Sequence, residues 1–102
     1  MIGGAGYIGS HVVKRLCDDH YNVTVFDNIS SGQRINIDRR AKFSKGDILD
    51  KKDLEKVFSD KSRRFDCVMH FAALKAAGES MLKPEKYSEN NIIGTINILN
   101  AM

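Results

Sequence analysis

Residues 3–10 read Gly-Gly-Ala-Gly-Tyr-Ile-Gly-Ser, and the spacing of Gly3, Gly6 and Gly9 decides the fold. Glycines at these intervals are typical of the turn between a strand and a helix that holds a dinucleotide pyrophosphate. Gly3 would allow a sharp reversal, Gly6 would let the backbone approach the pyrophosphate, and Gly9 would let the helix pack closely on the sheet. The free N–H groups and the dipole of that helix would then attract the phosphates.

The residues after the glycines favour this interpretation over an ordinary glycine-rich turn, which the spacing alone leaves open. Residues 10–19 predict a helix with Val13, Leu16 and Cys17 on one apolar face. Residues 22–26, Asn-Val-Thr-Val-Phe, predict a strand that ends at Asp27. An acidic residue at this distance from the glycines holds a ribose hydroxyl in NAD sites. Because it would repel a 2′-phosphate, we expect NAD rather than NADP.

The strand that should precede the glycines is too short in this sequence. Only Met1 and Ile2 come before Gly3, although this fold places a central strand there. A strand usually has five or six residues. We therefore expect a sheet without its first strand, in a chain that is a fragment of a longer protein.

Two more segments continue the alternation of strands and helices. Residues 28–33 are rich in turn formers. They either contact the adenosine ribose or form a plain surface loop. Residues 34–40 show no clear pattern. Residues 41–45 predict a short strand. Asp47 follows it, either as a contact to adenine or as a turn residue. Asp50 predicts the N-cap of a helix whose apolar stripe is Leu54, Val57 and Phe58.

The second half begins with residues 66–71, Asp-Cys-Val-Met-His-Phe, which predict a parallel strand buried on both faces. His70 within it is expected to be packed rather than catalytic. Small residues dominate 72–80 and would let a cofactor pass close to the backbone. Lys75 there would contact a phosphate or ribose, or would simply be solvated. From Pro84 a helix is predicted to the end, with inner positions Tyr87, Ile92, Thr95, Ile98, Leu99 and Met102.

Composition argues against several other classes of protein. The net charge of +3 comes from scattered residues without a nucleic-acid-binding signature, so we expect a solvated surface and no nucleic-acid partner. Cys17 and Cys67 have neither the spacing of a zinc site nor that of a disulfide framework, so no metal site is predicted. Free thiols and the absence of a long apolar run predict a cytoplasmic protein without a membrane partner.

Five motifs together resemble the extended short-chain dehydrogenase/reductases. They are GGAGYIGSH at 3–11, FDN at 26–28, GDI at 46–48, HFAALKAAGES at 70–80 and KPEKYSENNIIGT at 83–95. The last two resemble more narrowly the UDP-glucose 4-epimerases, also called UDP-galactose 4-epimerases. This resemblance covers nearly the whole chain. It implies an α/β protein with a partial, doubly wound Rossmann-type NAD-binding fold, in which the parallel sheet lacks its first strand and its C-terminal half. Residues 1–102 would form one incomplete NAD-binding domain.

The resemblance also assigns residues to each part of NAD. It gives the backbone of Tyr7 and Ile8 to the pyrophosphate, Asp27 and Asn28 with nearby Ser30 and Ser31 to the adenosine ribose, Asp47 and Ile48 to the adenine, and Phe71, Ala72, Ala73, Leu74, Lys75 and Asn90 to a wall along the cofactor. With Gly3, Gly6 and Gly9 these are the predicted cofactor-binding residues. Family members move a hydride from C4 of a UDP-sugar to bound NAD and return it to the other face of the 4-keto sugar.

The sequence departs from this family at its catalytic residues. The family uses a Tyr-x-x-x-Lys pair, but no lysine stands four positions after Tyr7, Tyr21 or Tyr87. Without a nearby lysine nothing lowers a phenol pKa toward neutrality. We therefore assign no catalytic residue and expect the chain alone to be inactive. The alternatives are another NAD-dependent nucleotide-sugar epimerase or dehydratase, and a non-catalytic NAD-binding module. By resemblance, the complete protein would be a homodimer.

Overall fold

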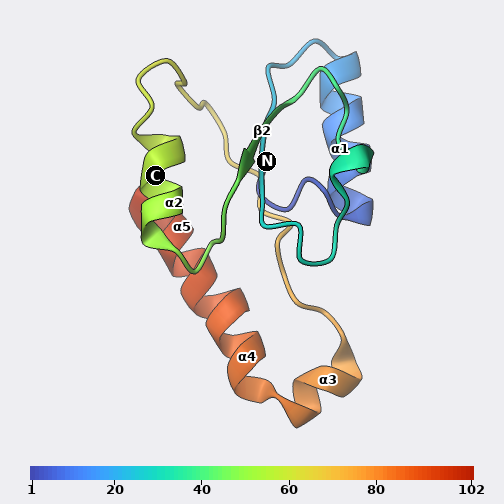
Figure 1. Cartoon of the computed structure of the whole chain (residues 1–102), viewed down its shortest axis with the longest axis vertical. Coiled ribbons are helices and arrows are strands. Elements are labelled where there is room, and N and C mark those ends of the chain that lie inside the picture. Colours follow the sequence, from blue (N-terminus) through green and yellow to red (C-terminus); the bar gives the residue numbers. More distant parts are fainter. The chain divides into compact units, whose positions relative to one another are not determined.

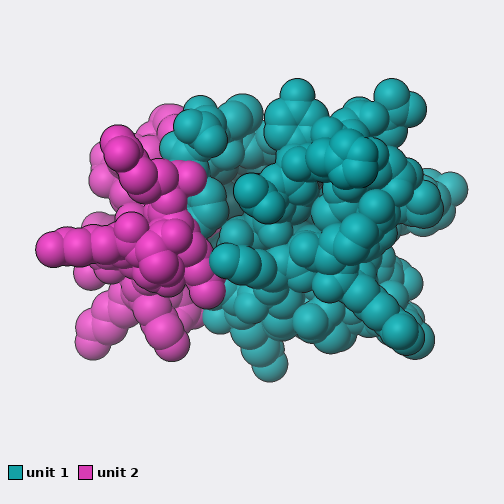
Figure 2. All heavy atoms as spheres, turned by 90° about the horizontal axis from the view of Figure 1, so that it is seen from above, with its two compact units in different colours: residues 1–46, 65–72 teal, residues 47–64, 73–102 magenta.

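A computed structural model describes all residues 1–102 (Figure 1). The contacts between residues divide the chain into two compact units (Figure 2). Unit 1 comprises residues 1–46 and 65–72, and unit 2 comprises residues 47–64 and 73–102. Unit 1 contains all the strands, whereas every regular element of unit 2 is helical. The two units are described separately below.

The sheet of unit 1 consists of two parallel strands, β1 (Thr24–Asp27) and β2 (Lys42–Lys45). Their register runs from Thr24 opposite Lys42 to Asp27 opposite Lys45. Both strands were predicted from the sequence, with bounds that differ by one or two residues. Val25 and Phe26 are buried, as expected for the β-branched and aromatic positions of an inner strand.

Met1 and Ile2 lie between β1 and the segment around His70. They form no strand, but Ile2 makes parallel bridges to Phe26 on one side and to His70 on the other. The amide of Ile2 donates to the carbonyl of Met69 at 2.8 Å, and the amide of Phe26 donates to the carbonyl of Met1 at 2.9 Å. The predicted order of a doubly wound sheet is therefore present, with two residues in place of its first strand.

The predicted buried strand at 66–71 is wrong. This segment makes only the single bridge of His70 to Ile2, and the side chains of Met69 and Phe71 are each 38% exposed. Cys67 and His70, predicted to be packed, are also exposed. The physical reason is that Ile2 is the only residue beside which this segment can form a β-bridge. A single bridge cannot support a regular strand or cover its faces.

The core of unit 1 lies between the sheet and helix α1 (Tyr7–Asp18), which begins three residues before its predicted start. Val13 and Cys17 are buried on this helix, and Leu16 is partly buried beside them, which confirms the predicted apolar face. A short 3₁₀ helix, η1 (Arg34–Asn36), occupies the segment that the sequence left unassigned. Ile37, which follows it, is 4% exposed and joins the same core.

Unit 2 is built from helices. They are α2 (Lys51–Phe58), α3 (Ala77–Leu82), α4 (Pro84–Ser88), the π-helical turn η2 (Glu89–Ile93) and α5 (Gly94–Ala101). Asp50 caps α2 by accepting from the amide of Lys52 at 2.9 Å, as the sequence predicted. Helix α2 lies beside α5 (Figure 1). No helix has both the length and the apolar character needed to cross a bilayer.

Two predictions for unit 2 need correction. Helix α3 occupies part of the small-residue stretch 72–80, between the segment 66–71 and the predicted final helix, where the sequence pointed to a loop and not to a helix. In the final helix Tyr87 and Ile98 are buried as predicted, but Ile92, Leu99 and Met102 are 59%, 64% and 66% exposed. The wider π turn interrupts the 3.6-residue period on which the prediction relied. The face that packs instead carries Gly94, Asn97 and Ile98.

Candidate functional site

Two of the three motif glycines are required by the protein's own packing. Gly3 has a φ of +80°, in the region that favours glycine, and a Cβ there would come within 2.5 Å of the amide nitrogen of Ala72. A Cβ on Gly9 would overlap the carbonyl oxygen of Gly3 and lie 3.0 Å from the Cα of Gly4. Gly9 therefore lets the helix pack on the glycine turn itself rather than on the strands of the sheet.

Gly6 differs, because the protein leaves the space beside it open. A Cβ on Gly6 would meet only the carbonyl oxygen of Gly3, at an ordinary contact distance of 3.7 Å. Gly6 is the N-cap of α1, no side chain caps this end of the helix, and its first turn contains no acidic residue. The first-turn N–H groups of Tyr7 and Ile8 thus begin a helix whose dipole favours an anion.

Asp27 connects the glycine turn to the loop after β1. Its Oδ2 accepts from the amide of Ala5 at 2.9 Å, and its Oδ1 accepts from the amide of Ile29 at 2.8 Å. A carboxylate has about four acceptor positions, so this one retains capacity for two more donors. The carboxylate that the sequence assigned to a ribose is therefore also a structural acceptor, which the spacing of the motif did not reveal.

The loop after Asp27 is tightly constrained. Ile29 has a φ of +60°, an uncommon conformation for a β-branched residue, and its side chain packs against the core of unit 1. Asn28 accepts from the amide of Ser30 at 3.0 Å, and the amide of Gln33 donates to the carbonyl of Ala5 at 3.2 Å. Strained backbone of this kind is concentrated at ligand-binding sites.

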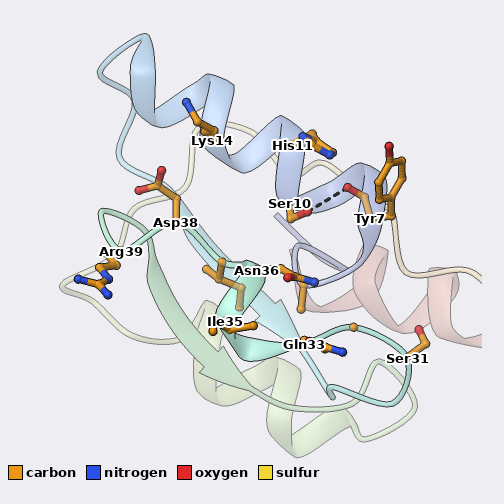
Figure 3. A pocket seen from close by; sticks show the side chains of 13 residues that line it. Tyr7, Ser10, His11, Lys14, Ser31, Gln33, Ile35, Asn36, Asp38 and Arg39 are labelled. Atoms are coloured by element: carbon orange, nitrogen blue, oxygen red, sulfur yellow. Dashed lines mark hydrogen bonds between the residues drawn. The ribbon is translucent and has the colours of Figure 1, made fainter.

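A polar hollow of about 640 Å³ lies beside the glycine turn (Figure 3). Tyr7, His11 and Lys14 line it from successive turns of α1, and the segment 31–39 lines it from the other side. It brings together two predicted residues, Tyr7 and Ser31, with several that the sequence did not single out. The spacing of residues 7, 11 and 14 along one helix face is the signal that could have found them.

In unit 2 the predicted adenine contacts lie in a compact turn before α2. The amide of Asp47 donates to Oδ2 of Asp53 at 3.1 Å, and Oδ1 of Asp47 accepts from the amide of Leu49 at 2.9 Å. Ile48 is 5% exposed, so only its backbone is suited to a ligand. The carboxylate of Asp47 therefore shapes the turn.

The predicted wall 73–75 is held by an asparagine that the sequence did not single out. Asn91 accepts from the amide of Leu74 through Oδ1 and donates to the carbonyl of Leu74 through Nδ2, both at 2.9 Å. The predicted residue, Asn90, donates to Oδ1 of Asn91 at 3.0 Å. The hydroxyl of Thr95 donates to the carbonyl of Asn91 at 2.7 Å. The π turn thus holds both asparagines close to the wall, as π turns often do at functional sites.

Comparison with known proteins identifies the family. A model described as the NAD dependent epimerase/dehydratase family matches residues 1–102. The chain belongs to this family. It is 46% identical to UDP-glucose 4-epimerase 3 of Oryza sativa subsp. japonica, over 100% of this chain and 30% of that protein. The chain therefore spans about a third of the length of the relatives it matches.

Solved structures support the same assignment. A crystal structure of UDP-glucose 4-epimerase shares 46% identity, with a TM-score of 0.95 over 99% of this chain and 30% of that one. The Bifidobacterium longum UDP-glucose 4-epimerase, solved in complex with NAD+ and UDP, shares 35% identity, with a TM-score of 0.92 over 99% of this chain and 32% of that one. The partial doubly wound Rossmann-type fold expected from the sequence is confirmed.

The epimerase-family chain distributes its predicted cofactor residues over both units. Unit 1 contains Gly3, Gly6, Tyr7, Ile8, Gly9, Asp27, Asn28, Ser30, Ser31, Phe71 and Ala72. Unit 2 contains Asp47, Ile48, Ala73, Leu74, Lys75 and Asn90. Within unit 1, hydrogen bonds link the glycine turn to the loop after Asp27. Within unit 2, Asn90 and the wall meet at Asn91, whereas Lys75 is exposed. No group of side chains that could hold a metal ion is present.

The epimerase-family residues fit a dinucleotide by their own geometry. The uncapped start of α1 offers amide donors beside the open space at Gly6, and Asp27 keeps free acceptor positions next to it. A pyrophosphate needs the first feature and a ribose diol needs the second. No proton-transferring pair accompanies them, because no tyrosine is followed by a lysine at the family's offset.

Proposed function

We propose that residues 1–102 form the NAD-binding part of a UDP-glucose 4-epimerase. The observation that carries this proposal is the pairing of an open, uncapped helix start at Gly6 with the carboxylate of Asp27. Amide donors at the helix start suit the pyrophosphate, and the carboxylate suits the ribose hydroxyls while disfavouring a 2′-phosphate. The names of the relatives supply the reaction and the substrate class, a UDP-sugar.

The proposal gives each predicted segment one task. The backbone of Tyr7 and Ile8 binds the pyrophosphate, Asp27 and Asn28 bind the adenosine ribose with Ser30 and Ser31 beside them, Asp47 and Ile48 border the adenine, and Phe71, Ala72, Ala73, Leu74, Lys75 and Asn90 line the rest of the cofactor. When bound, NAD accepts a hydride from C4 of the sugar and returns it. The chain's own residues bind and orient the dinucleotide, and the proton-transferring pair comes from outside residues 1–102.

The complete protein is proposed to be a homodimer in the cytoplasm. The support for the dimer is an apolar stripe on the final helix, where Ile92, Ile96 and Leu99 are 59%, 49% and 64% exposed at helical spacing. Exposed apolar side chains in a row favour association with another surface. Two cysteines without a disulfide partner support a reducing compartment.

A titration and a chimera test the proposal. Calorimetry should show saturable binding of NAD to the chimera described next, and replacing Asp27 by Ala should weaken that binding by at least about 100-fold. For the reaction, this chain would replace the matching segment of the Bifidobacterium longum enzyme. The chimera should interconvert UDP-galactose and UDP-glucose, and the same substitution should lower kcat/KM by about 100-fold, equivalent to about 2.7 kcal/mol. A folded chimera that contains NAD but acts only on another nucleotide sugar would favour a different epimerase or dehydratase.

A non-catalytic NAD-binding module is the second candidate, supported by the missing Tyr-x-x-x-Lys pair. The activity of the same chimera distinguishes the two candidate functions. An enzyme segment supports turnover when the host supplies the catalytic pair, whereas an unrelated NAD module binds NAD without supporting turnover.

A further inference from the structure

Asn97 is the only polar residue in the buried part of the structure. It lies on α5 at 6% exposure, between Gly94 and Ile98, on the face that packs toward α2. A buried amide is costly unless its hydrogen-bonding groups are used, and an apolar side chain of similar size would fill the position at lower cost. The presence of asparagine here calls for a specific partner.

That partner is the backbone of the turn before α2. Nδ2 of Asn97 donates to the carbonyl oxygen of Ile48 at 3.1 Å. Gly94, one turn earlier on α5, lies so close to Ile48 that a Cβ would be 2.8 Å from its Cγ1. The helix therefore contacts both the carbonyl and the side chain of the same residue, and glycine is required for this approach.

The other bonds of this turn either close the turn itself or lead to α2. The amide of Asp47 donates to Asp53, the amide of Asp50 donates to the carbonyl of Asp47 at 3.1 Å, and Asp50 caps the helix. These contacts fix the two ends of the turn. The peptide in its middle, which joins Ile48 to Leu49, is held on both sides. Its amide donates to Oδ1 of Asp47 at 2.9 Å, and its carbonyl oxygen accepts from Asn97, which connects it to a second helix.

We infer that Asn97 is a positioning residue that sets the Asp47–Ile48 turn for recognition of the adenine ring. This inference rests on the proposed function, which assigns the turn to the adenine. Ile48 is buried, so its own part in recognition uses its backbone atoms, and the direction of those atoms depends on the peptide whose carbonyl Asn97 holds. Loss of the Asn97 amide should therefore weaken the recognition of the adenine base more than the binding of the rest of the dinucleotide.

The test compares Asn97→Asp with Asn100→Asp in the chimera with the Bifidobacterium longum enzyme. Both substitutions add one negative charge to α5, but Asn100 is exposed and makes no bond to Ile48. Asn97→Asp keeps the shape of the side chain and places an oxygen opposite the carbonyl of Ile48. The ligands are NAD and nicotinamide hypoxanthine dinucleotide, whose base carries a carbonyl where adenine carries an amino group. Calorimetry gives both dissociation constants, and thermal melting reports folding.

We expect Asn97→Asp to weaken NAD binding about tenfold and to lower the preference for NAD over the hypoxanthine analogue about threefold. Asn100→Asp should change neither. If Asn97→Asp does not melt cooperatively, Asn97→Ser makes the same comparison without the added charge. An equal loss of affinity for both ligands would overturn the inference, because it shows a general structural role. Failure of the folded, unsubstituted chimera to bind either ligand would instead overturn the proposed function, and the inference with it.

Discussion

The predicted cofactor residues of unit 1 and unit 2 are held in place by different means. In unit 1 they are held mainly within one short motif, because Gly3 and Gly9 allow close approach of the backbone and the carboxylate of Asp27 accepts from two backbone amides. In unit 2 the side chains of Asn91 and Asn97 reach from one helical segment to the backbone of Leu74 and Ile48. A site made by backbone depends on glycine and a short motif, whereas a site held by side chains depends on residues far along the chain.

The largest expected effect is that of Asp27→Ala in unit 1. The amides of Ala5 and Ile29 would lose a charged acceptor, and each such bond contributes about 1.5–3 kcal/mol. We expect the free energy of unfolding to fall by about 3–6 kcal/mol and the affinity for NAD to fall by at least about 100-fold. Urea denaturation and calorimetry measure the two quantities.

The control for this change is Asp19→Ala, which removes an exposed carboxylate whose ion pair with Arg15 lies on the surface. Surface pairs of this kind contribute about 0–1 kcal/mol, so stability and NAD affinity should remain close to those of the original chain. Undiminished NAD affinity in Asp27→Ala would show that this carboxylate does not connect the glycine turn to the ribose site.

Two glycine substitutions sharpen the comparison at the level of the backbone. Gly9→Ala places a methyl group against the carbonyl of Gly3, and overpacking of this kind costs about 1–3 kcal/mol. Gly78→Ala on α3 meets no atom within 4 Å, so it should stabilise by about 0.5–1 kcal/mol through helix propensity. Thermal melting of the two variants should therefore move in opposite directions. A higher melting temperature for Gly9→Ala would contradict the packing at Gly9.

This difference explains how much of unit 1 could be predicted. The turn at Gly3, the helix face of Val13 and Cys17, and both strands follow from local patterns, because spacing and β-branching report directly on backbone geometry. The segment 66–71 was predicted wrongly for a physical reason. Its apolar run indicated a buried strand, but burial depends on neighbours, and the structure supplies one bridge through Ile2.

In unit 2 the sequence indicated the wall 73–75 but not the asparagine that holds it. Asn90 was chosen by resemblance, while the residue that pairs with Leu74 is Asn91. No local pattern marks this pairing, since it spans 17 positions and depends on a π turn that changes the helical period. Asn97 was missed for a similar reason, because an asparagine in an apolar helix reveals its role only when its partner is known.

Paired substitutions at Asn90 and Asn91 test this division of roles. Asn91→Ala leaves the amide and the carbonyl of Leu74 without their partners, so we expect a loss of about 1–3 kcal/mol in the free energy of unfolding. Asn90→Ala removes only a donor to Asn91 and should cost less than about 1 kcal/mol, while still weakening NAD binding. Chemical denaturation compares the two variants. Equal destabilisation would show that the wall 73–75 does not depend on Asn91.

The smallest effect concerns the charged contact between α3 and α4 in unit 2. Glu79 accepts from the ammonium of Lys86 and from the hydroxyl of Tyr87, each at 2.7 Å. These hydrogen bonds lower the pKa of the Glu79 carboxyl below its ordinary value of 4.5, and the bond from Lys86 has the larger effect. A lowered pKa in the folded state means that the contact contributes fully above pH 4.5 and is lost as the pH falls through the folded-state pKa.

Glu79→Gln should therefore remove part of the acid dependence of stability below about pH 4.5, because the amide cannot titrate. Glu85→Gln, on the exposed surface of α4, provides a matched control and should leave the acid dependence unchanged. Urea midpoints measured from pH 7 down to pH 3 test both variants. Because the contact is open to solvent, salt should weaken the effect, which distinguishes it from the uncharged amide bonds of Asn91 and Asn97 in the same unit.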